Sequence, residues 1–299
     1  ELRRRPLMAF MLLPASLAVV APPAPILVLG PGSLDLRLCT AKLAARAGFS
    51  ASVLTAQGQQ YSVRRWMYGA DYSDIGRDEA GNVQLLSEPS SIAEGINKAE
   101  AICLVCDAAA LPEDSLPALL EAASSLKRVV LVSRIGVTRA KPGPFGLGNG
   151  DLELLRGEER LRDAAASRGF DLSTVRVGTL KGGGPGAATD GDIGLAKSFY
   201  DSILELETAL VTQSYDKFTL GAKCFAGDPL DLPNIVLRTA YRGSFDARDE
   251  ETSRVLAAGA AVAAFQHARP IEFTVSSAKG EVPPTAGQWE RILNDLSSV

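Results

Sequence analysis

The sequence predicts an α/β fold with a doubly wound parallel sheet of about seven strands and a small C-terminal helical portion. Runs of strand length, among them 26–29, 101–106 and 128–133, are apolar almost throughout, which is typical of parallel strands covered on both faces. Stretches with helical periodicity separate these runs at the spacing of βαβ units. There is no internal repeat and no linker, so residues 26–299 are expected to form one domain behind an arm of residues 1–25.

The same patterns place the remaining elements. Strands are expected at 51–55, 82–86, 173–177, 217–225 and 271–276. Helices are expected at 90–99, 112–127, 151–169, 231–242, 254–268 and 285–296, with a helix and then a loop over 190–210. The segment 61–81 is polar but holds three tyrosines and Trp66, which indicates either a partner surface or a small satellite core. The Gly/Pro-rich segments 140–150 and 181–186 are expected to be loops.

Composition excludes several classes of function. The chain has 299 residues, of which 46% are hydrophobic and 22% charged, so it has enough apolar residues for a full core. Its net charge of -4 argues against a nucleic-acid partner, which requires a basic face. One histidine, His267, argues against a His-dependent triad or a multi-histidine metal site.

The cysteines give no sign of a disulfide framework or a metal site. Four cysteines are too few for such a framework in a chain of this length. Cys103 and Cys106 form a C-x-x-C pair, but in an expected strand their odd separation sends the two side chains to opposite faces. There is no second pair, so no metal is expected.

Residues 1–25 read ELRRRPLMAFMLLPASLAVVAPPAP, a basic start followed by an apolar stretch, Leu7–Val20, and a proline-rich end. That order is typical of a signal or thylakoid-transfer segment. The apolar stretch is shorter than the ~20 residues that cross a bilayer, and Pro14 interrupts it. Three interpretations stay open: an anchor or partner-binding segment, an uncleaved targeting remnant, or a structured arm on its own domain.

The first strand leads into a glycine turn and a helix, which is the opening unit of a Rossmann dinucleotide-binding fold. Of the G-x-G-x-x-G pattern, Gly30 and Gly32 fit, while Asp35 stands at the third glycine position. The backbone N–H groups of Gly30, Gly32, Ser33 and Leu34 either cradle a pyrophosphate or simply form a tight turn without a ligand.

After the second expected strand come Thr55 and Gln57, which are candidate cofactor contacts. No acidic residue follows that strand to bind ribose hydroxyls, which disfavours NAD and leaves NADP as the candidate cofactor. Arg64 and Arg65 lie further on and serve either a 2′-phosphate or, as a solvated pair, no ligand at all.

The ends of the later strands supply the other candidates. Candidate cofactor contacts at the crevice are Cys106, Asp107, Ser133, Val177, Gly178 and Thr179. Asp107 either touches a ribose or, without a ligand, caps a helix or is solvated. Arg134 and Arg176 face either an anionic ligand or salt bridges to Glu158 or Glu159.

The motifs RVVLVSRIGV, LLRGEERLRDAAASRGFDLSTVRVGTL and IEFTVSSAKG, in this order, resemble the atypical short-chain dehydrogenase/reductase family. The nearest resemblance is to its plastid NAD(P)-binding Rossmann proteins, and it covers most of the chain from Ile26 onward. The resemblance implies a Rossmann fold with a dinucleotide crevice and a plastid location, with the mitochondrion as the second choice.

Members of that family that transfer hydride use a Tyr general acid with a Lys four residues later and a Ser after the fifth strand. The chain has no Tyr-x-x-x-Lys pair; Asn149, Gly150 and Asp151 stand where the Tyr is expected, and Leu154 or Leu155 where the Lys is expected. Ser133 is present, but Arg134 takes the place of the usual working Ser.

The family's glycine pattern, G-x-x-G-x-x-G, is also incomplete in this chain. Gly30 occupies its first glycine position, but Ser33 and Leu36 occupy the other two. After the sixth strand, Arg176-Val177-Gly178 lacks the proline of the family's Arg-Pro-Gly. No residue is therefore nominated as catalytic.

Two functions follow. The first is a non-catalytic subunit or assembly factor of an organellar membrane complex, expected at the thylakoid, that binds a dinucleotide weakly or not at all. Its protein partners would be met through the arm 1–25 and the aromatic segment 61–81. The second is an NADPH-dependent oxidoreductase with an unusual acid.

Overall fold

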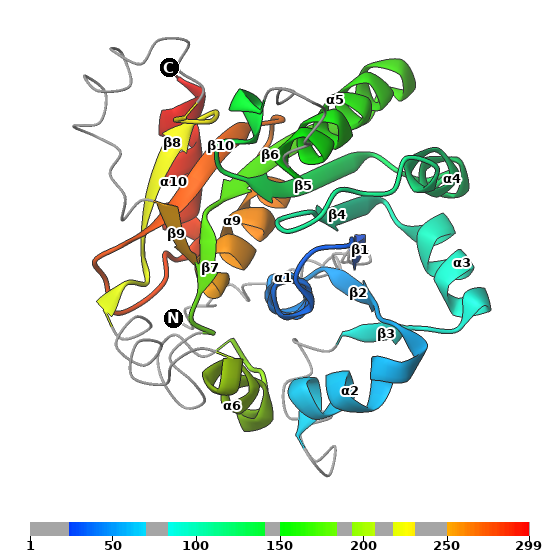
Figure 1. Ribbon diagram of the computed structural model, residues 1–299, viewed down its shortest axis with the longest axis horizontal. Helices are drawn as coiled ribbons and strands as arrows, with labels where there is room; N and C mark the ends of the chain where they lie inside the picture. Colours follow the sequence, from blue (N-terminus) through cyan, green and yellow to red (C-terminus); the bar gives the residue numbers. More distant parts are fainter. Residues whose placement is uncertain are drawn as a thin grey trace, which may run out of the picture.

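A computed structural model describes residues 24–69, 83–140, 150–183, 193–206, 218–230 and 250–298. Its centre is a sheet of eight strands with helices on both faces (Figure 1). In chain order, the strands of this sheet are β1 (Pro25–Leu29), β2 (Ser50–Leu54), β3 (Gln84–Leu86), β4 (Ala101–Val105), β5 (Arg128–Arg134), β6 (Asp171–Val177), β8 (Gly221–Ala226) and β10 (Glu272–Ala278). The helices are α1 (Leu34–Arg46), α2 (Gln60–Tyr68), α3 (Pro89–Lys98), α4 (Ser115–Ala122), α5 (Gly150–Arg168), α6 (Lys197–Leu206), α9 (Arg254–Gln266) and α10 (Ala286–Ser297).

The strand order is β3-β2-β1-β4-β5-β6-β10-β8, and all neighbours are parallel except β10 and β8. The chain leaves β1 toward β3, then crosses back to β4 on the other side of β1. The order therefore reverses between β1 and β4, and open sheets of this kind bind ligands above the carboxyl ends of the strands at that point. The doubly wound parallel sheet predicted from the sequence is confirmed, with β8 added as an antiparallel edge.

Each face of the sheet has its own apolar core because strand side chains alternate. In β1, Ile26 and Val28 pack toward α1, α2, α6, α9 and α10, whereas Leu27 and Leu29 pack toward α3, α4 and α5. The two helical layers are visible on either side of the sheet in Figure 1. Cys103 belongs to the first core and Cys106 to the second, which confirms the expected opposite faces.

The helix boundaries follow from local chemistry. α3 begins at Pro89, whose fixed φ and missing N–H suit the first helical turn. α10 begins with a capping box in which Thr285 and Gln288 exchange side-chain and backbone hydrogen bonds. α9 carries so many buried apolar residues, from Val255 to Phe265, because it packs on the sheet with α1 and α10 beside it.

Three expectations need correction or fall outside the described residues. Part of the segment 61–81 is helix α2, whose Trp66 contacts Phe199 edge-on and whose Tyr68 is buried. Both residues join the same core as Ile26 and Val28 of β1, so the expected satellite core is part of the main core. Residues 70–82 and the helix expected at 231–242 lie outside the described residues. The loop expected at 181–186 begins inside β7 (Thr179–Lys181), which pairs with β9 (Glu251–Ser253) in a small parallel sheet.

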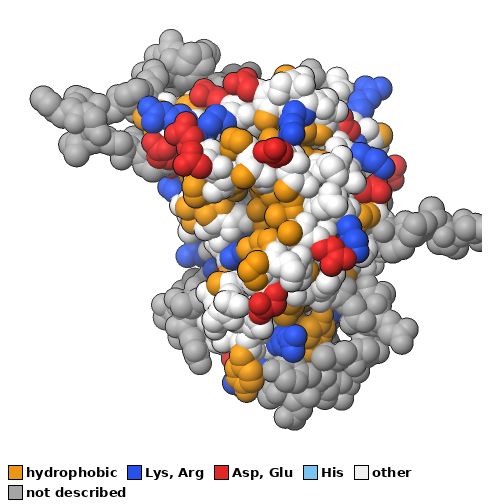
Figure 2. Space-filling model, turned by 90° about the vertical axis from the view of Figure 1, so that its right-hand side faces the viewer, with side chains coloured by type: hydrophobic (Ala, Val, Ile, Leu, Met, Phe, Trp, Pro, Cys, Tyr) orange, Lys and Arg blue, Asp and Glu red, His pale blue; other side chains and the backbone are white. Residues whose placement is uncertain are grey.

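The side of the molecule that carries α3 and α4 has hydrophobic side chains gathered in its middle, with charged residues of both signs around them (Figure 2). Between α4 and α5 lies an open groove of ≈ 640 Å³, with Leu116, Pro117 and Leu120 on one wall and Arg160 and Asp163 on the other.

Among the described residues, no helix combines the length and the apolar character that crossing a membrane requires.

Candidate functional site

The turn between β1 and α1 is pressed onto the end of β4. Gly30 has a φ of 135°, and a Cβ there would lie 2.2 Å from the carbonyl oxygen of Val105. The N–H of Gly32 donates to that same carbonyl at 2.9 Å, and a Cβ on Gly32 would lie 2.2 Å from Oδ1 of Asp107. Both glycines are therefore required by the approach of the chain's own strand β4, whether or not a ligand binds.

A carboxylate of the protein occupies the N-terminus of α1. The side chain of Asp107, which is 9% exposed, accepts hydrogen bonds from the backbone N–H of Ser33 at 2.9 Å and from its hydroxyl at 2.5 Å. Ser33 is the N-cap of α1, so Asp107 meets the positive end of that helix. Of the roles expected for Asp107, the structure therefore shows the helix-capping one.

The acid at the start of α1, Asp35, is held by an arginine of another helix. Asp35 forms an ion pair with Arg254, the first residue of α9. A second nitrogen of Arg254 donates to the carbonyl oxygen of Gly182 at 2.7 Å, which links α1 to the end of β7. Leu34 is half-buried against the core, and Leu36 is fully buried in it. The acidic substitution in the glycine pattern thus serves contacts between helices.

After β2, the predicted cofactor contacts Thr55 and Gln57 form hydrogen bonds with residues at the end of β3 and just after it. The N–H of Thr55 donates to the carbonyl of Leu86 at 2.9 Å, and the side-chain amide of Gln57 donates to the carboxylate of Glu88 at 3.2 Å. Glu88 was not expected at this corner, because it follows β3 and the sequence shows no acidic residue after β2. The pairing of β2 with β3 brings it here, so a prediction that these two strands are neighbours would have identified it.

Arg37 belongs to the same corner of the crevice. It donates to the carbonyl of Leu54, the last residue of β2, at 2.9 Å. Burial lowers the pKa of its guanidinium, and the carboxylates of Asp107 and Asp35 oppose that shift. Arg37 is therefore the cation beside Asp107, while Arg64 and Arg65 are exposed on α2.

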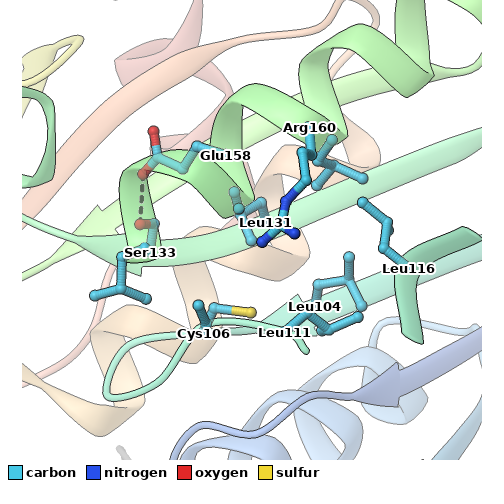
Figure 3. A pocket seen from close by; sticks show the side chains of 12 residues that line it. Leu104, Cys106, Leu111, Leu116, Leu131, Ser133, Glu158 and Arg160 are labelled. Atoms are coloured by element: carbon cyan, nitrogen blue, oxygen red, sulfur yellow. Dashed lines mark hydrogen bonds between the residues drawn. The ribbon is translucent and has the colours of Figure 1, made fainter. Parts of the chain in front are cut away.

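Cys106 and Ser133 face a cavity away from the α1 turn. This cavity, of ≈ 20 Å³, lies between β4 and β5 on one side and α4 and α5 on the other, and half of the residues that line it are leucines (Figure 3). That volume has room for one water molecule. Burial, with the nearby Asp107 carboxylate, raises the pKa of the Cys106 thiol to about 12, so it is not a nucleophile at neutral pH.

Ser133 leads into a buried network of charged residues. Its hydroxyl donates to Glu158 at 2.5 Å, at one end of the cavity (Figure 3). The other carboxylate oxygen of Glu158 accepts from Arg176 at 2.6 Å, and Arg176 also donates to Glu272 at 2.6 Å. Arg176 is fully buried, and its Nε lies 3.8 Å from Asp228.

Asp228 extends the network to the loop after β5. Its carboxylate accepts hydrogen bonds from the N–H of Gly136 at 2.9 Å and the hydroxyl of Thr138 at 2.6 Å. Three carboxylates from α5, β10 and the turn after β8 thus surround one guanidinium. The expected salt bridge of Arg176 to Glu158 is confirmed, whereas Arg134 pairs with Asp151 instead.

The segment after β6 is held by β9. The N–H of Gly178 donates to the hydroxyl of Thr252 at 2.9 Å, and a Cβ on Gly178 would lie 2.1 Å from the carbonyl oxygen of Glu250. Val177 is fully buried, and Thr179 pairs with Glu251 in the small sheet. Close approach of another strand explains this glycine, as it explains Gly30.

The twelve predicted contacts therefore separate into groups. The structure brings Gly30, Gly32, Ser33, Leu34 and Asp107 together, joins Thr55 and Gln57 to β3, and places Cys106 and Ser133 on one cavity. Their role as cofactor contacts stays a prediction. Among the described residues, no three His, Cys, Asp or Glu side chains form a cluster that could hold a metal ion.

Comparison with known proteins gives similarity to solved structures only. No family model and no curated protein matches the sequence. The yeast methylglyoxal/isovaleraldehyde reductase complexed with NADPH is 11% identical, with a TM-score of 0.48 over 85% of this chain and 76% of that one. The UDP-N-acetylglucosamine 4-epimerase from Methanobrevibacter ruminantium M1, complexed with UDP-N-acetylmuramic acid, is 11% identical, with a TM-score of 0.46 over 93% and 83%.

A third structure, a putative exported protein from Burkholderia pseudomallei, is 17% identical, with a TM-score of 0.42 over 84% of this chain and 98% of that one. Identities and TM-scores this low carry no inference about ligand or activity. The chemistry of the site therefore rests on the contacts described above.

Gly30→Ala tests the close approach of the α1 turn to β4. The new Cβ meets a backbone oxygen at a φ that only glycine adopts readily, so we expect the free energy of unfolding to fall by about 2–5 kcal/mol. Gly58→Ala is the matched control, because nothing lies within 4 Å of a Cβ there, and it should stay within about 1 kcal/mol of wild type. Urea unfolding measures both, and equal stabilities would contradict the packing account.

Glu158→Gln tests the buried network through its pH dependence. Burial raises the pKa of Glu158 above its ordinary 4.5, although Arg176 and Ser133 oppose this. The folded wild type therefore binds the proton more tightly than the unfolded chain, and it loses stability as pH rises from 4.5 through the folded pKa. Glu158→Gln has no such proton, so its stability relative to wild type should rise with pH in that window, by at most about 1.4 kcal/mol per pH unit.

Urea unfolding across that pH range measures the difference. Glu153→Gln, on the exposed side of the same helix, corrects for the general effect of removing one negative charge. A relative stability that falls with pH would show that Arg176 outweighs burial.

Proposed function

We propose that this protein is a non-catalytic Rossmann-fold subunit or assembly factor of an organellar membrane complex, at the thylakoid of a plastid, with no tightly bound dinucleotide. One observation carries the non-binding part. Asp107 holds the N-terminus of α1, where the pyrophosphate of a dinucleotide would be bound by backbone N–H groups and the helix dipole.

The energetic consequence of Asp107 can be estimated. Two like unit charges about 4 Å apart repel by roughly 4 kcal/mol at an effective dielectric constant of 20. That is close to a thousandfold loss of affinity for a phosphate at the same helix end. The ligand would also have to displace the hydrogen bonds that Asp107 makes with Ser33.

The chemistry of hydride transfer is also missing its usual acid. The chain has no Tyr-x-x-x-Lys pair, and Ser133 is 1% exposed and bonded to Glu158. A side chain that takes part in the reaction has to come within hydrogen-bond distance of the reacting group, and this serine is buried beneath α5. The alternative, an NADPH-dependent oxidoreductase of the same fold, is supported by the intact strand–turn–helix around Gly30.

Thermal unfolding with NADPH and NADP+ separates the two functions. For the wild type we expect no change in Tm at about 1 mM cofactor, because Asp107 occupies the helix end. Asp107→Ala removes the carboxylate and frees the N–H and hydroxyl of Ser33, so it should gain a cofactor-dependent rise in Tm, after a loss of about 0.5–2 kcal/mol for the missing cap. A dose-dependent rise in the wild type, with consumption of NADPH, would establish the oxidoreductase instead.

Asp35→Ala is the matched control for that experiment. It removes the other carboxylate of the same turn, which is paired with Arg254, and leaves Asp107 on Ser33. We therefore expect it to stay unresponsive to cofactor. If it responds as Asp107→Ala does, general loss of negative charge explains the effect.

The membrane-complex part is supported by the apolar stretch Leu7–Val20 and is tested separately. In isolated plastid membranes, we expect the full chain to co-migrate with a large complex on a native gel. A chain without residues 1–23 should shift to the soluble fraction, because the arm supplies the contact. Unchanged partition of the shortened chain would remove the arm from this role.

A further inference from the structure

A second groove lies on the other helical layer, between α1 and α10, with α9 as its floor. It encloses ≈ 360 Å³. Of the twelve residues that line it, eleven are apolar or glycine and only Gln266 is polar, so it fits an uncharged apolar occupant. This differs from the groove between α4 and α5, whose lining includes Glu113, Glu121 and Arg168.

The floor of the groove is one stripe of α9. Val255, Gly259, Val262 and Gln266 line it at spacings of four, three and four residues, which places them on one face of the helix. At 1.5 Å per residue the stripe is about 16 Å long. It therefore takes a segment of about five extended residues or three helical turns.

The walls of the groove come from the neighbouring helices. Leu43 and Ala47, near the end of α1, form one wall, and Ala286 and Trp289, near the start of α10, form the other. Trp289 packs over Gly259, where a Cβ would lie 3.2 Å from the indole Nε1. One of the two tryptophans in the chain thus stands in the groove as a natural reporter.

The apolar arm enters the fold beside this groove. The carbonyl of Ala24, the first described residue, accepts a hydrogen bond from the N–H of Ser50 at 3.1 Å. Ser50 follows Ala47 of the groove wall by three residues, a span of at most about 11 Å. Residues 21–24 reach about 13 Å when extended, so the apolar stretch that precedes them reaches the groove.

We propose that the apolar stretch Leu7–Val20 of this chain docks in the α1–α9–α10 groove of the same molecule. The stretch carries no charged residue, as the groove requires. Its last six residues, 15–20, span about 20 Å when extended, which is enough to cover the stripe of about 16 Å on α9. Pro14 and the pair Pro22-Pro23 bracket these six residues and disfavour a helix across them.

This inference goes beyond the proposed function and stands without it, because it concerns the purified chain alone. It states where the arm lies when the protein is not bound to its membrane complex. The docked arm covers apolar groove surface, and it is at the same time withheld from a membrane or partner. A partner that takes the arm uncovers the groove.

The first test is a disulfide trap in the full chain. Leu17→Cys with Ala286→Cys places one thiol on the arm and one on the far wall of the groove, in a Cys224→Ser background that removes the half-buried native thiol. Docking raises the effective concentration of the two thiols, so we expect an intramolecular disulfide to form at least about tenfold faster than in the control pair. That control is Leu17→Cys with Ala166→Cys, whose second thiol lies on the exposed side of α5 on the other face of the sheet.

The second test reads the groove itself, so that a failed disulfide geometry does not decide alone. In full-length Trp66→Phe, emission comes from Trp289 only. Leu17→Asp should shift that emission to longer wavelength as the apolar arm leaves, whereas Leu17→Ile should leave it unchanged.

The proposal is overturned by equal oxidation of the two cysteine pairs together with an unchanged Trp289 emission. It is also overturned by a covalent dimer as the main oxidation product, since a second copy would then occupy the groove. The disulfide trap and the Trp289 emission use neither cofactor nor membrane, so their outcome is independent of the tests of the proposed function.

Discussion

The contact between Asp107 and Ser33 is the constraint on which the crevice depends. It joins the end of β4 to the start of α1 and thereby fixes the turn that Gly30 and Gly32 make over Val105. A helix N-terminus has unpaired N–H groups and a partial positive charge that some acceptor must satisfy. In this chain the acceptor is covalently part of the fold, so the helix end is satisfied without a ligand.

Beneath α5, the charged network around Arg176 is a second constraint, and it joins β5, β6 and β10. Arg176 is fully buried, and its charge is compensated by Glu158 and Glu272, with Asp228 nearby. A buried guanidinium without such partners would cost several kcal/mol, which explains why three carboxylates converge here. Ser133, a predicted cofactor contact, is 1% exposed and donates to Glu158 of this network.

The sequence was sufficient for most of the fold, but it left the contacts around the crevice open. Apolar runs and helical periodicity placed the central strands, and the turn at Gly30 placed the strand reversal above β1. Periodicity could not place β7 and β9, because three residues are too few to show alternation. The role of Asp107 could be stated only as alternatives, because its partner Ser33 is 74 residues away and only the fold brings them together. Glu88, Asp228 and Glu272 were missed for the same reason: they follow or belong to strands other than the ones they serve.

The partners of Arg176 also set the order in which the molecule can be completed during synthesis. Two of its three carboxylates, Asp228 and Glu272, leave the ribosome long after β6 has been made, and β10, which pairs with β6, comes later still than α9. Until then the nascent chain has a cation on β6 without most of its compensation, and α1 lacks the helix that packs beside it. The N-terminal two-thirds of the chain therefore lacks two of these carboxylates and the helix that packs on α1, and a ribosome that stalls before β10 presents an open apolar face to chaperones.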